Sequence, residues 1–131
     1  MKTKERIVQI DGQEIKMRIS GATPILYRNE FKKDMFVQMQ ELDKGEILYD
    51  DEGNAVSVSL PDGAVETLLE LAYILARQGD SKLKVSFIEW LDRFSFDSLT
   101  NGDAFGSVLL MIRGDEEPIV EEKKSQDQQS E

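Results

Sequence analysis

The chain has 131 residues, of which 40% are hydrophobic and 32% charged, and its formal net charge is −10. This length suits one domain with a hydrophobic core of its own. The negative charge argues against a nucleic-acid backbone or an anionic membrane as the partner. The absence of cysteine and histidine removes disulfides, thiolate metal sites and the usual general base near neutral pH. No apolar run approaches the ~18 residues that span a bilayer, and we expect no secretory signal.

Residues 5–20 have the alternating pattern of a β-hairpin. Apolar residues alternate with polar ones in two short runs, and Asp11-Gly12 lies between the runs. Asp-Gly is a strong two-residue turn signal, because glycine tolerates positive φ. The pattern therefore predicts two antiparallel strands joined by this turn.

After Gly21, the sequence has the pattern of one capped amphipathic helix from Pro24 to Asp43. Thr23 lies where an N-cap belongs, and Pro24 takes the first helical position, where its missing N–H costs nothing. At 100° per residue, the large apolar side chains of this helix fall on one arc of about 120°. The arc consists of Tyr27, Phe31, Met35, Met39 and Leu42.

Either the rest of this chain or another protein must cover the apolar arc. A core-facing helix is the simpler interpretation, but methionine side chains repack easily and suit an adaptable binding surface. The candidate partner-binding residues are Tyr27, Arg28, Phe31, Met35 and Met39. For Arg28, which lies at the edge of the arc, two roles are open. Its methylenes pack on the arc while the guanidinium reaches water, or it forms an ion pair with a partner or another copy of this chain.

The segment 46–60 allows two interpretations. Ile47 and Tyr49 could face the apolar residues of 56–60 across a turn at 51–54, which would make a second hairpin. The same residues could instead form a mobile excursion between two helices. The pattern alone does not separate these alternatives.

A second helix is predicted from about Asp62 to Gly79. Asp62 is a good N-cap after Pro61, and Gly79 is a good residue to follow the last helical turn. The interior of this helix, 65–76, is apolar on nearly all sides, which is typical of a helix buried on most of its surface. We expect this helix to form the centre of the core.

The third helix has a clear start signal, because Ser86-x-x-Glu89 is a capping box. Val85 before the cap and Trp90 inside the helix make a hydrophobic staple, and the helix is predicted to continue to Phe94.

The last helical segment is predicted over 96–113, with Asn101-Gly102 as a kink or a split and Gly114 as the stop. Residues 114–131 hold seven acidic residues and two lysines, with few apolar residues, so we expect disorder there. The predicted fold is α+β, mainly α. It consists of an N-terminal β-hairpin followed by a four- to five-helix bundle in a single domain over 1–113, with a disordered acidic C-terminal tail over 114–131.

No motif in this sequence predicts catalysis. The glycine-rich loops that bind phosphate are missing, and the acidic cluster 50–52 lacks the ligand spacing of a calcium loop. We interpret that cluster as a solvated turn. The sequence therefore nominates no catalytic residue, no metal ligand and no cofactor.

Two ordered blocks of short motifs run through the chain. The first block is Ala22-Thr23-Pro24-x-Leu26-Tyr27-Arg28-x-x-Phe31, then Asp34-x-Phe36, then Glu41-Leu42-Asp43-Lys44. The second block is Glu70-Leu71-Ala72-Tyr73-x-x-Ala76-Arg77-Gln78-x-Asp80, then Glu89-Trp90-Leu91-Asp92-x-Phe94. Their content and order resemble the tail assembly chaperones of long-tailed, siphovirus-type phages and prophages of Gram-positive bacteria, over roughly residues 15–112. The sequence departs from that pattern in its longer, more β-like connection at 47–60 and in the absence of a tryptophan at the end of the last helix.

The resemblance implies a non-enzymatic protein in the cytoplasm of a bacterial host. Such chaperones bind the tape measure protein, a very long, helical and aggregation-prone chain, before the tail tube polymerises around it, and are then released. The major tail tube protein and a second copy of the chain are further candidate partners, and neither nucleic acid nor a membrane is expected. The family often makes a longer product by ribosomal frameshifting, and Lys123-Lys124 could be encoded by a slippery adenine run.

Two other functions stay open as alternatives. One is a structural tail component of the tail completion or connector type, retained in the virion, whose hairpin would extend the sheet of a neighbour. The other is a small hydrolase that uses paired carboxylates. A chaperone for apolar helices, by contrast, requires an adaptable apolar groove within a charged exterior.

Overall fold

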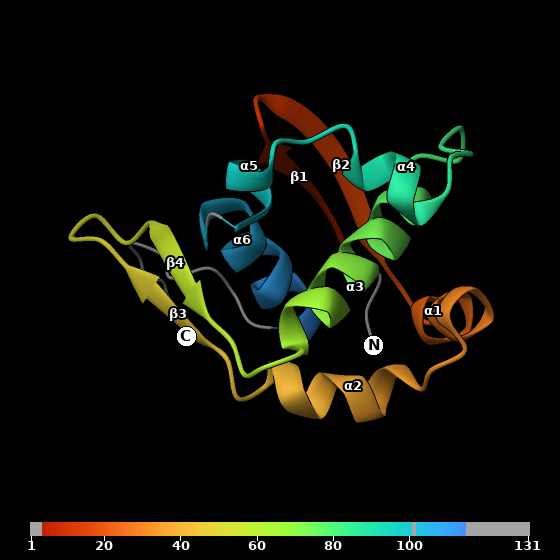
Figure 1. The fold of residues 1–131 in the computed structure, drawn as a ribbon, viewed down its shortest axis with the longest axis horizontal. Helices are drawn as coiled ribbons and strands as arrows, with labels where there is room; N and C mark the ends of the chain where they lie inside the picture. The colour runs from red at the N-terminus through yellow and green to blue at the C-terminus, as the bar shows by residue number, and fades with distance from the viewer. Residues whose placement is uncertain (1–3, 101, 115–131) are drawn as a thin grey trace, which may run out of the picture.

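The computed structural model describes residues 4–100 and 102–114, except for the side chains of 55–58, 99–100 and 102–105. Its elements follow one another as a hairpin, two helices, a second hairpin and four helices (Figure 1). They are β1 (Lys4–Ile10), β2 (Gln13–Ile19), α1 (Thr23–Phe31), α2 (Met35–Leu42), β3 (Glu46–Tyr49), β4 (Ala55–Ser59), α3 (Ala64–Gly79), α4 (Phe87–Leu91), α5 (Phe96–Thr100) and α6 (Gly102–Arg113). The tail predicted to be disordered lies, from 115 onward, outside the described residues.

The fold is α+β, with an N-terminal hairpin and helices making up about half of the described residues, which confirms the predicted class. The described residues form six helices where four or five were predicted, and α4 and α5 have only five residues each. Helix α3 crosses the middle of the molecule (Figure 1). The β1–β2 hairpin lies behind α3, helices α1 and α2 pack along it, and the β3–β4 hairpin projects at the end away from α1.

Strands β1 and β2 pair antiparallel across the Asp11-Gly12 turn, as predicted. Both turn residues have positive φ, 56° at Asp11 and 77° at Gly12, and this is the geometry of a type I′ turn. One face of the hairpin is buried, and β2 packs against α3. The buried residues of the hairpin are Val8, Ile10, Met17 and Ile19.

The start of α1 differs from the prediction that Thr23 is its N-cap. Ala22 holds the N-cap position without a side-chain hydrogen bond, and Pro24 lies in the first turn. The buried Thr23 hydroxyl accepts a 2.9 Å hydrogen bond from the Ser20 backbone N–H and donates one to the Gln78 side chain. Thr23 therefore joins the start of α1 to the end of α3.

The single helix predicted from Pro24 to Asp43 is wrong, because the chain breaks it into α1 and α2. Lys32 follows α1 in the left-handed conformation with φ of 60°. Asp34 then caps α2, and its side chain accepts a 2.8 Å hydrogen bond from the Phe36 backbone N–H. Aspartate is a strong N-cap residue, and here it starts a new helix where the apolar periodicity suggested a continuous one.

Residues 46–60 form the second hairpin, which decides between the two interpretations of this segment. Strands β3 and β4 pair antiparallel, with Ile47 opposite Val58, and an irregularity falls between Leu48 and Tyr49. Helix α6 packs against β4. The acidic cluster 50–52 lies at the turn, as predicted, and the Asp50 carboxylate accepts hydrogen bonds from the backbone of Glu52 and Asn54.

Helix α3 is the centre of the core, as predicted. Its residues from Leu71 to Ala76 are all buried. Its N-cap is Gly63, with φ of 85°, in place of the predicted Asp62. Gly79 is the last helical residue and its φ is not positive, so glycine is needed here for another reason. A Cβ at Gly79 would lie 2.0 Å from the Lys16 carbonyl oxygen, because β2 passes directly over this position.

The capping box that begins α4 is confirmed. The Ser86 hydroxyl accepts from the Glu89 backbone N–H at 3.2 Å, and the Glu89 carboxylate accepts from the Ser86 N–H at 3.1 Å. The helix ends at Leu91, short of the predicted Phe94. The predicted last segment corresponds to α5 and α6, and Asn101 of the predicted kink lies outside the described residues. Gly114, with φ of 80°, follows α6 as its stop.

We predict that Gly79→Ala lowers the free energy of unfolding by about 1–3 kcal/mol, because the new methyl group forces α3 away from the backbone of β2. The midpoint of urea unfolding measures this change. Gly21→Ala is the matched control, since a Cβ at Gly21 meets nothing within 4 Å and the φ there is not positive. Equal effects of the two substitutions would contradict the close approach of β2 to α3.

Candidate interaction site

The structure separates the five predicted partner-binding residues by burial. Tyr27 and Met35 are buried, with 0% and 1% of their surface exposed, so the rest of this chain covers this part of the arc, which is the simpler of the two interpretations. Phe31 and Met39 are half-buried and pack against the core. Only Arg28 is exposed. The arc is internal because α1 and α2 both pack against α3, whose apolar surface they cover.

A buried carboxylate lies where α1 and α2 meet α3. Glu70 of α3 is 3% exposed, and the Tyr27 hydroxyl donates a 2.7 Å hydrogen bond to it. The Lys33 ammonium, from the α1–α2 junction, lies 3.0 and 3.3 Å from the two Glu70 oxygens. Burial and the neighbouring Glu70 carboxylate raise the pKa of Tyr27 far above its ordinary value. Glu70 therefore attaches α1 and the α1–α2 junction to α3, a role that the sequence prediction missed.

A row of aromatic rings connects α1, α3 and α4. Successive ring centroids lie between 5.1 and 6.3 Å apart, mostly in tilted or edge-to-face arrangements. Such pairs add to the stability gained from burial alone. The rings belong to Tyr27, Phe31, Tyr73, Phe87, Trp90 and Phe94.

Tyr73 links this aromatic row to the connection between α3 and α4. Its hydroxyl donates a 2.6 Å hydrogen bond to the Val85 carbonyl oxygen, which holds the end of the connection against α3. Burial raises the pKa of Tyr73, although the nearby Arg77 opposes this change. The Arg77 guanidinium lies over the Tyr73 ring, 5.4 Å from its centroid, and pairs with the Glu30 carboxylate at 2.9 Å.

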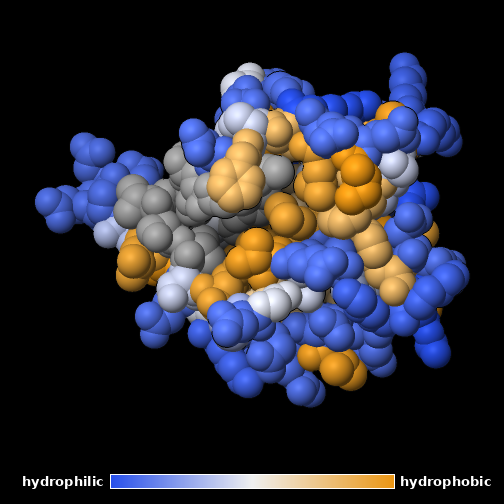
Figure 2. Space-filling view, in the orientation of Figure 1, coloured by the Kyte–Doolittle hydropathy of each residue, from blue (hydrophilic) through white to orange (hydrophobic). Residues whose placement is uncertain are grey.

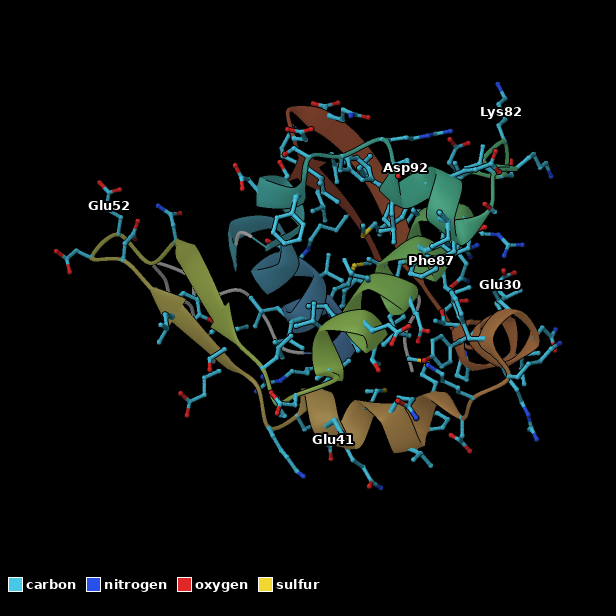
Figure 3. The ribbon with its side chains drawn as sticks, viewed as in Figure 1. Glu30, Glu41, Glu52, Lys82, Phe87 and Asp92 are labelled. Carbon is cyan, nitrogen blue, oxygen red and sulfur yellow. The ribbon has the colours of Figure 1, made fainter. Side chains whose placement is uncertain are left out.

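A groove of about 590 Å³ lies between α1, α3, α4 and the connection that joins α3 to α4. We call it the α1–α4 groove. Its apolar lining comes from α1, α3 and the connection, whereas α4 contributes Glu89. The apolar lining residues are Leu26, Tyr73, Ile74, Leu83 and Val85. In Figure 3, Glu30 of α1 and Lys82 of the connection stand on the groove side of the molecule, whereas Glu52 marks the far end at the β3–β4 turn.

The charged residues of the α1–α4 groove are Glu30, Arg77, Lys84 and Glu89. Two of them are acidic and two are basic, so the groove has no strong net charge. Glu30 pairs with Arg77, and Glu89 accepts a hydrogen bond from the Ser86 backbone N–H. That backbone bond is the main cause that lowers the pKa of Glu89. The carboxylates of Glu30 and Glu89 therefore both have partners within the chain. Nothing in the groove favours the alternative function of a hydrolase that uses paired carboxylates.

Further apolar side chains are exposed on the two helices that flank the groove. Ile25 of α1 is 58% exposed and Ile88 of α4 is 63% exposed, next in sequence to Leu26 and Glu89 of the groove. Figure 2 shows apolar side chains gathered over the middle of one face of the molecule, with hydrophilic side chains around its edge. Exposed apolar side chains that gather on one face are typical of an interaction site.

No family model, no curated protein and no solved structure matches this chain. Within residues 4–100 and 102–114, no group of three or more acidic side chains is placed to hold a metal ion. The same residues form no helix with the length and apolar character needed to cross a membrane. Function has to be inferred from the motif pattern and from the geometry of the α1–α4 groove.

We predict that Tyr27→Phe lowers the free energy of unfolding by about 1–3 kcal/mol at neutral pH, because Glu70 loses a hydrogen bond in a buried place. The pH dependence should change as well. Above the ordinary tyrosine pKa of 10.0, the unfolded chain loses the Tyr27 proton while the folded chain retains it, so the stability of the native chain falls as pH rises. Urea unfolding between neutral and alkaline pH should show a shallower fall for the variant.

Tyr49→Phe is the matched control for this experiment, because Tyr49 is 42% exposed and lies outside the core. It should lower the stability at neutral pH much less than Tyr27→Phe does. The same alkaline slope for Tyr27→Phe and for the native chain would show that Tyr27 is not held protonated by the fold.

Proposed function

We propose that this chain is a tail assembly chaperone of the siphovirus type. It binds and solubilises the tape measure protein before the tail tube polymerises, is released afterwards, and carries out no chemical reaction. The observation that carries this proposal is that the two motif blocks, which resemble the chaperone family, contact each other in the folded chain. Residues of the first block contact residues of the second at Tyr27–Glu70, Thr23–Gln78 and Phe31–Tyr73. The blocks are therefore parts of one structural unit.

The two blocks also line the α1–α4 groove together. Leu26 comes from the first block, whereas Tyr73, Arg77 and Glu89 come from the second. We propose that one face of a tape measure helix lies in this groove, since an amphipathic helix docks its apolar side into a groove with an apolar lining. The two acidic and two basic residues of the groove suit a helix that carries both signs beside its apolar stripe. This placement replaces the arc of Tyr27, Met35 and Met39 as the docking surface.

The exterior of the chain fits the same role. A net charge of −10 keeps copies loaded on a long apolar partner apart from one another. The groove is small relative to a very long helical chain, so several copies would share one tape measure protein. Many moderate contacts give strong total binding and still allow release of single copies by the polymerising tube subunits.

We predict that Leu26→Asp lowers co-purification with a co-expressed tape measure protein by about tenfold or more, because it places a charge in the apolar lining of the groove. Leu26 is 37% exposed, so the fold should persist. Circular dichroism and the urea midpoint check that it does. Met35→Lys cannot serve this purpose, because Met35 is buried and the charge would disrupt the core.

Ile7→Asp is the matched control, since Ile7 is an equally apolar side chain, 59% exposed, on β1 and not part of the groove lining. It should leave co-purification unchanged. Equal binding by both variants would exclude the groove as the docking surface. Finding the chain in purified mature particles would overturn the chaperone function itself and favour the structural tail component.

A further inference from the structure

A second hollow, of about 400 Å³, lies between β3 and the last turns of α6. We call it the β3 hollow. It is lined by five consecutive residues, from Gly45 to Tyr49, and by Leu110 and Arg113 of α6. The Arg113 guanidinium donates a 3.1 Å hydrogen bond to the Gly45 carbonyl oxygen and so holds the end of α6 against the start of β3. The whole of β3 therefore forms one side of the hollow.

Strand β3 is also an open edge. Among the residues that the structure describes, β3 pairs with β4 alone, and α6 packs against β4. In an antiparallel pair, alternate residues direct their N–H and C=O groups away from the partner strand, so β3 presents backbone donors and acceptors on its outer side. Leu48 is 51% exposed and Tyr49 is 42% exposed. An edge of this kind can accept a further strand.

The β3–β4 hairpin is strongly acidic on the β3 side. Four exposed acidic residues lie on β3 or directly after it, namely Glu46, Asp50, Asp51 and Glu52. The chain has no basic residue between Lys44 and Arg77. Lys44 itself lies 2.9 Å from the Glu41 carboxylate, with which it pairs. Figure 3 shows Glu52 at the tip of the projecting hairpin. The hairpin therefore carries negative charge that no basic residue of its own balances.

This charge decides between the possible occupants of the edge. If the β3 strands of two copies paired antiparallel about Leu48, Glu46 of one copy would lie opposite Asp50 of the other, and like charges opposite each other destabilise a sheet. Parallel pairing would bring the two acidic turns side by side. Residues 115–122 of the same chain have five acidic side chains and no basic one. A basic segment of another protein is therefore the occupant that fits.

We propose that the open edge of β3 binds an extended segment of another protein in which apolar residues alternate with lysine or arginine. The backbone of the segment pairs with β3. Side chains of a strand point to its two faces in turn, so the apolar ones fill the β3 hollow and the basic ones approach Asp51 and Glu52. This contact is independent of the proposed chaperone function, because the β3 hollow and the α1–α4 groove share no residue.

A synthetic peptide of alternating lysine and valine, seven residues long with both ends blocked, tests this proposal on the full chain. NMR titration should show saturable shifts of the β3 amide signals. The amides on the outer side of β3 should exchange with solvent about tenfold more slowly when the peptide is bound, because they then donate hydrogen bonds to it. Added salt should weaken the binding, since the charges involved are exposed.

Two control peptides separate strand pairing from attraction by charge alone. The first has the same sequence with N-methyl groups on alternate residues, so it keeps the side chains but lacks backbone donors. The second has glutamate in place of lysine. Both should bind at least tenfold more weakly than the lysine peptide. Equal binding of either control would overturn the proposal.

A pair of charge reversals on the protein locates the site. Asp51→Lys with Glu52→Lys should weaken peptide binding by about tenfold at low salt. Glu14→Lys with Asp92→Lys is the matched control, because these residues are also exposed, lie outside the β3 hollow and change the net charge equally. It should weaken the binding far less, and an equal loss in both variants would overturn the proposal.

Hydrogen exchange without peptide tests the other occupants. The amides on the outer side of β3 should exchange rapidly in the free chain at every protein concentration. Protection that grows with protein concentration would assign the edge to a second copy and overturn the proposal. Protection at every concentration would assign the edge to a segment of the same chain and would also overturn it.

Discussion

The buried helix α3 determines how the rest of the described chain is arranged. Its stretch from Leu71 to Ala76 is buried all round, so no single neighbour can cover it. Strand β2 covers one side, and helices α1, α2, α4 and α6 contact the others. Apolar burial contributes about 25 cal/mol for each Å² removed from water, so these contacts dominate the free energy of folding. The buried arc residues of α1 and α2, such as Tyr27, Met35 and Leu42, are used for this purpose, and they are not available to a partner.

Glu70 explains why α1 and α2 are two helices. A buried carboxylate that loses its partner costs roughly 3–5 kcal/mol, whereas a left-handed residue such as Lys32 costs about 1–2 kcal/mol. The break after Phe31 brings Lys33 within 3.0 Å of Glu70 while Tyr27 stays on the same carboxylate. The pairing of the buried charge outweighs the strain of the turn and the loss of a continuous helix.

The sequence predicted those features that depend on neighbouring residues. Asp11-Gly12 and the Ser86–Glu89 capping box are local signals, and both hold in the structure. The break before Asp34 was missed because apolar periodicity outweighed a single good N-cap residue. The role of Glu70 could have been suspected, since one acidic residue within an apolar helix needs a buried partner. The α1–α4 groove could not be predicted, because its walls come from segments that meet only in the folded chain.

The groove also differs from the predicted binding surface in the source of its adaptability. Its walls are held by packed aromatic rings and by the Tyr73 hydrogen bond to Val85, so they cannot repack as exposed methionines would. The adjustable parts are long charged side chains. Arg77 and Glu30 form a pair with side chains 39% and 37% exposed, and such pairs contribute at most about 1 kcal/mol. A docking helix can therefore separate this pair at low cost and use either charge. A partner held in this way could also be displaced, and the proposed chaperone function requires such release.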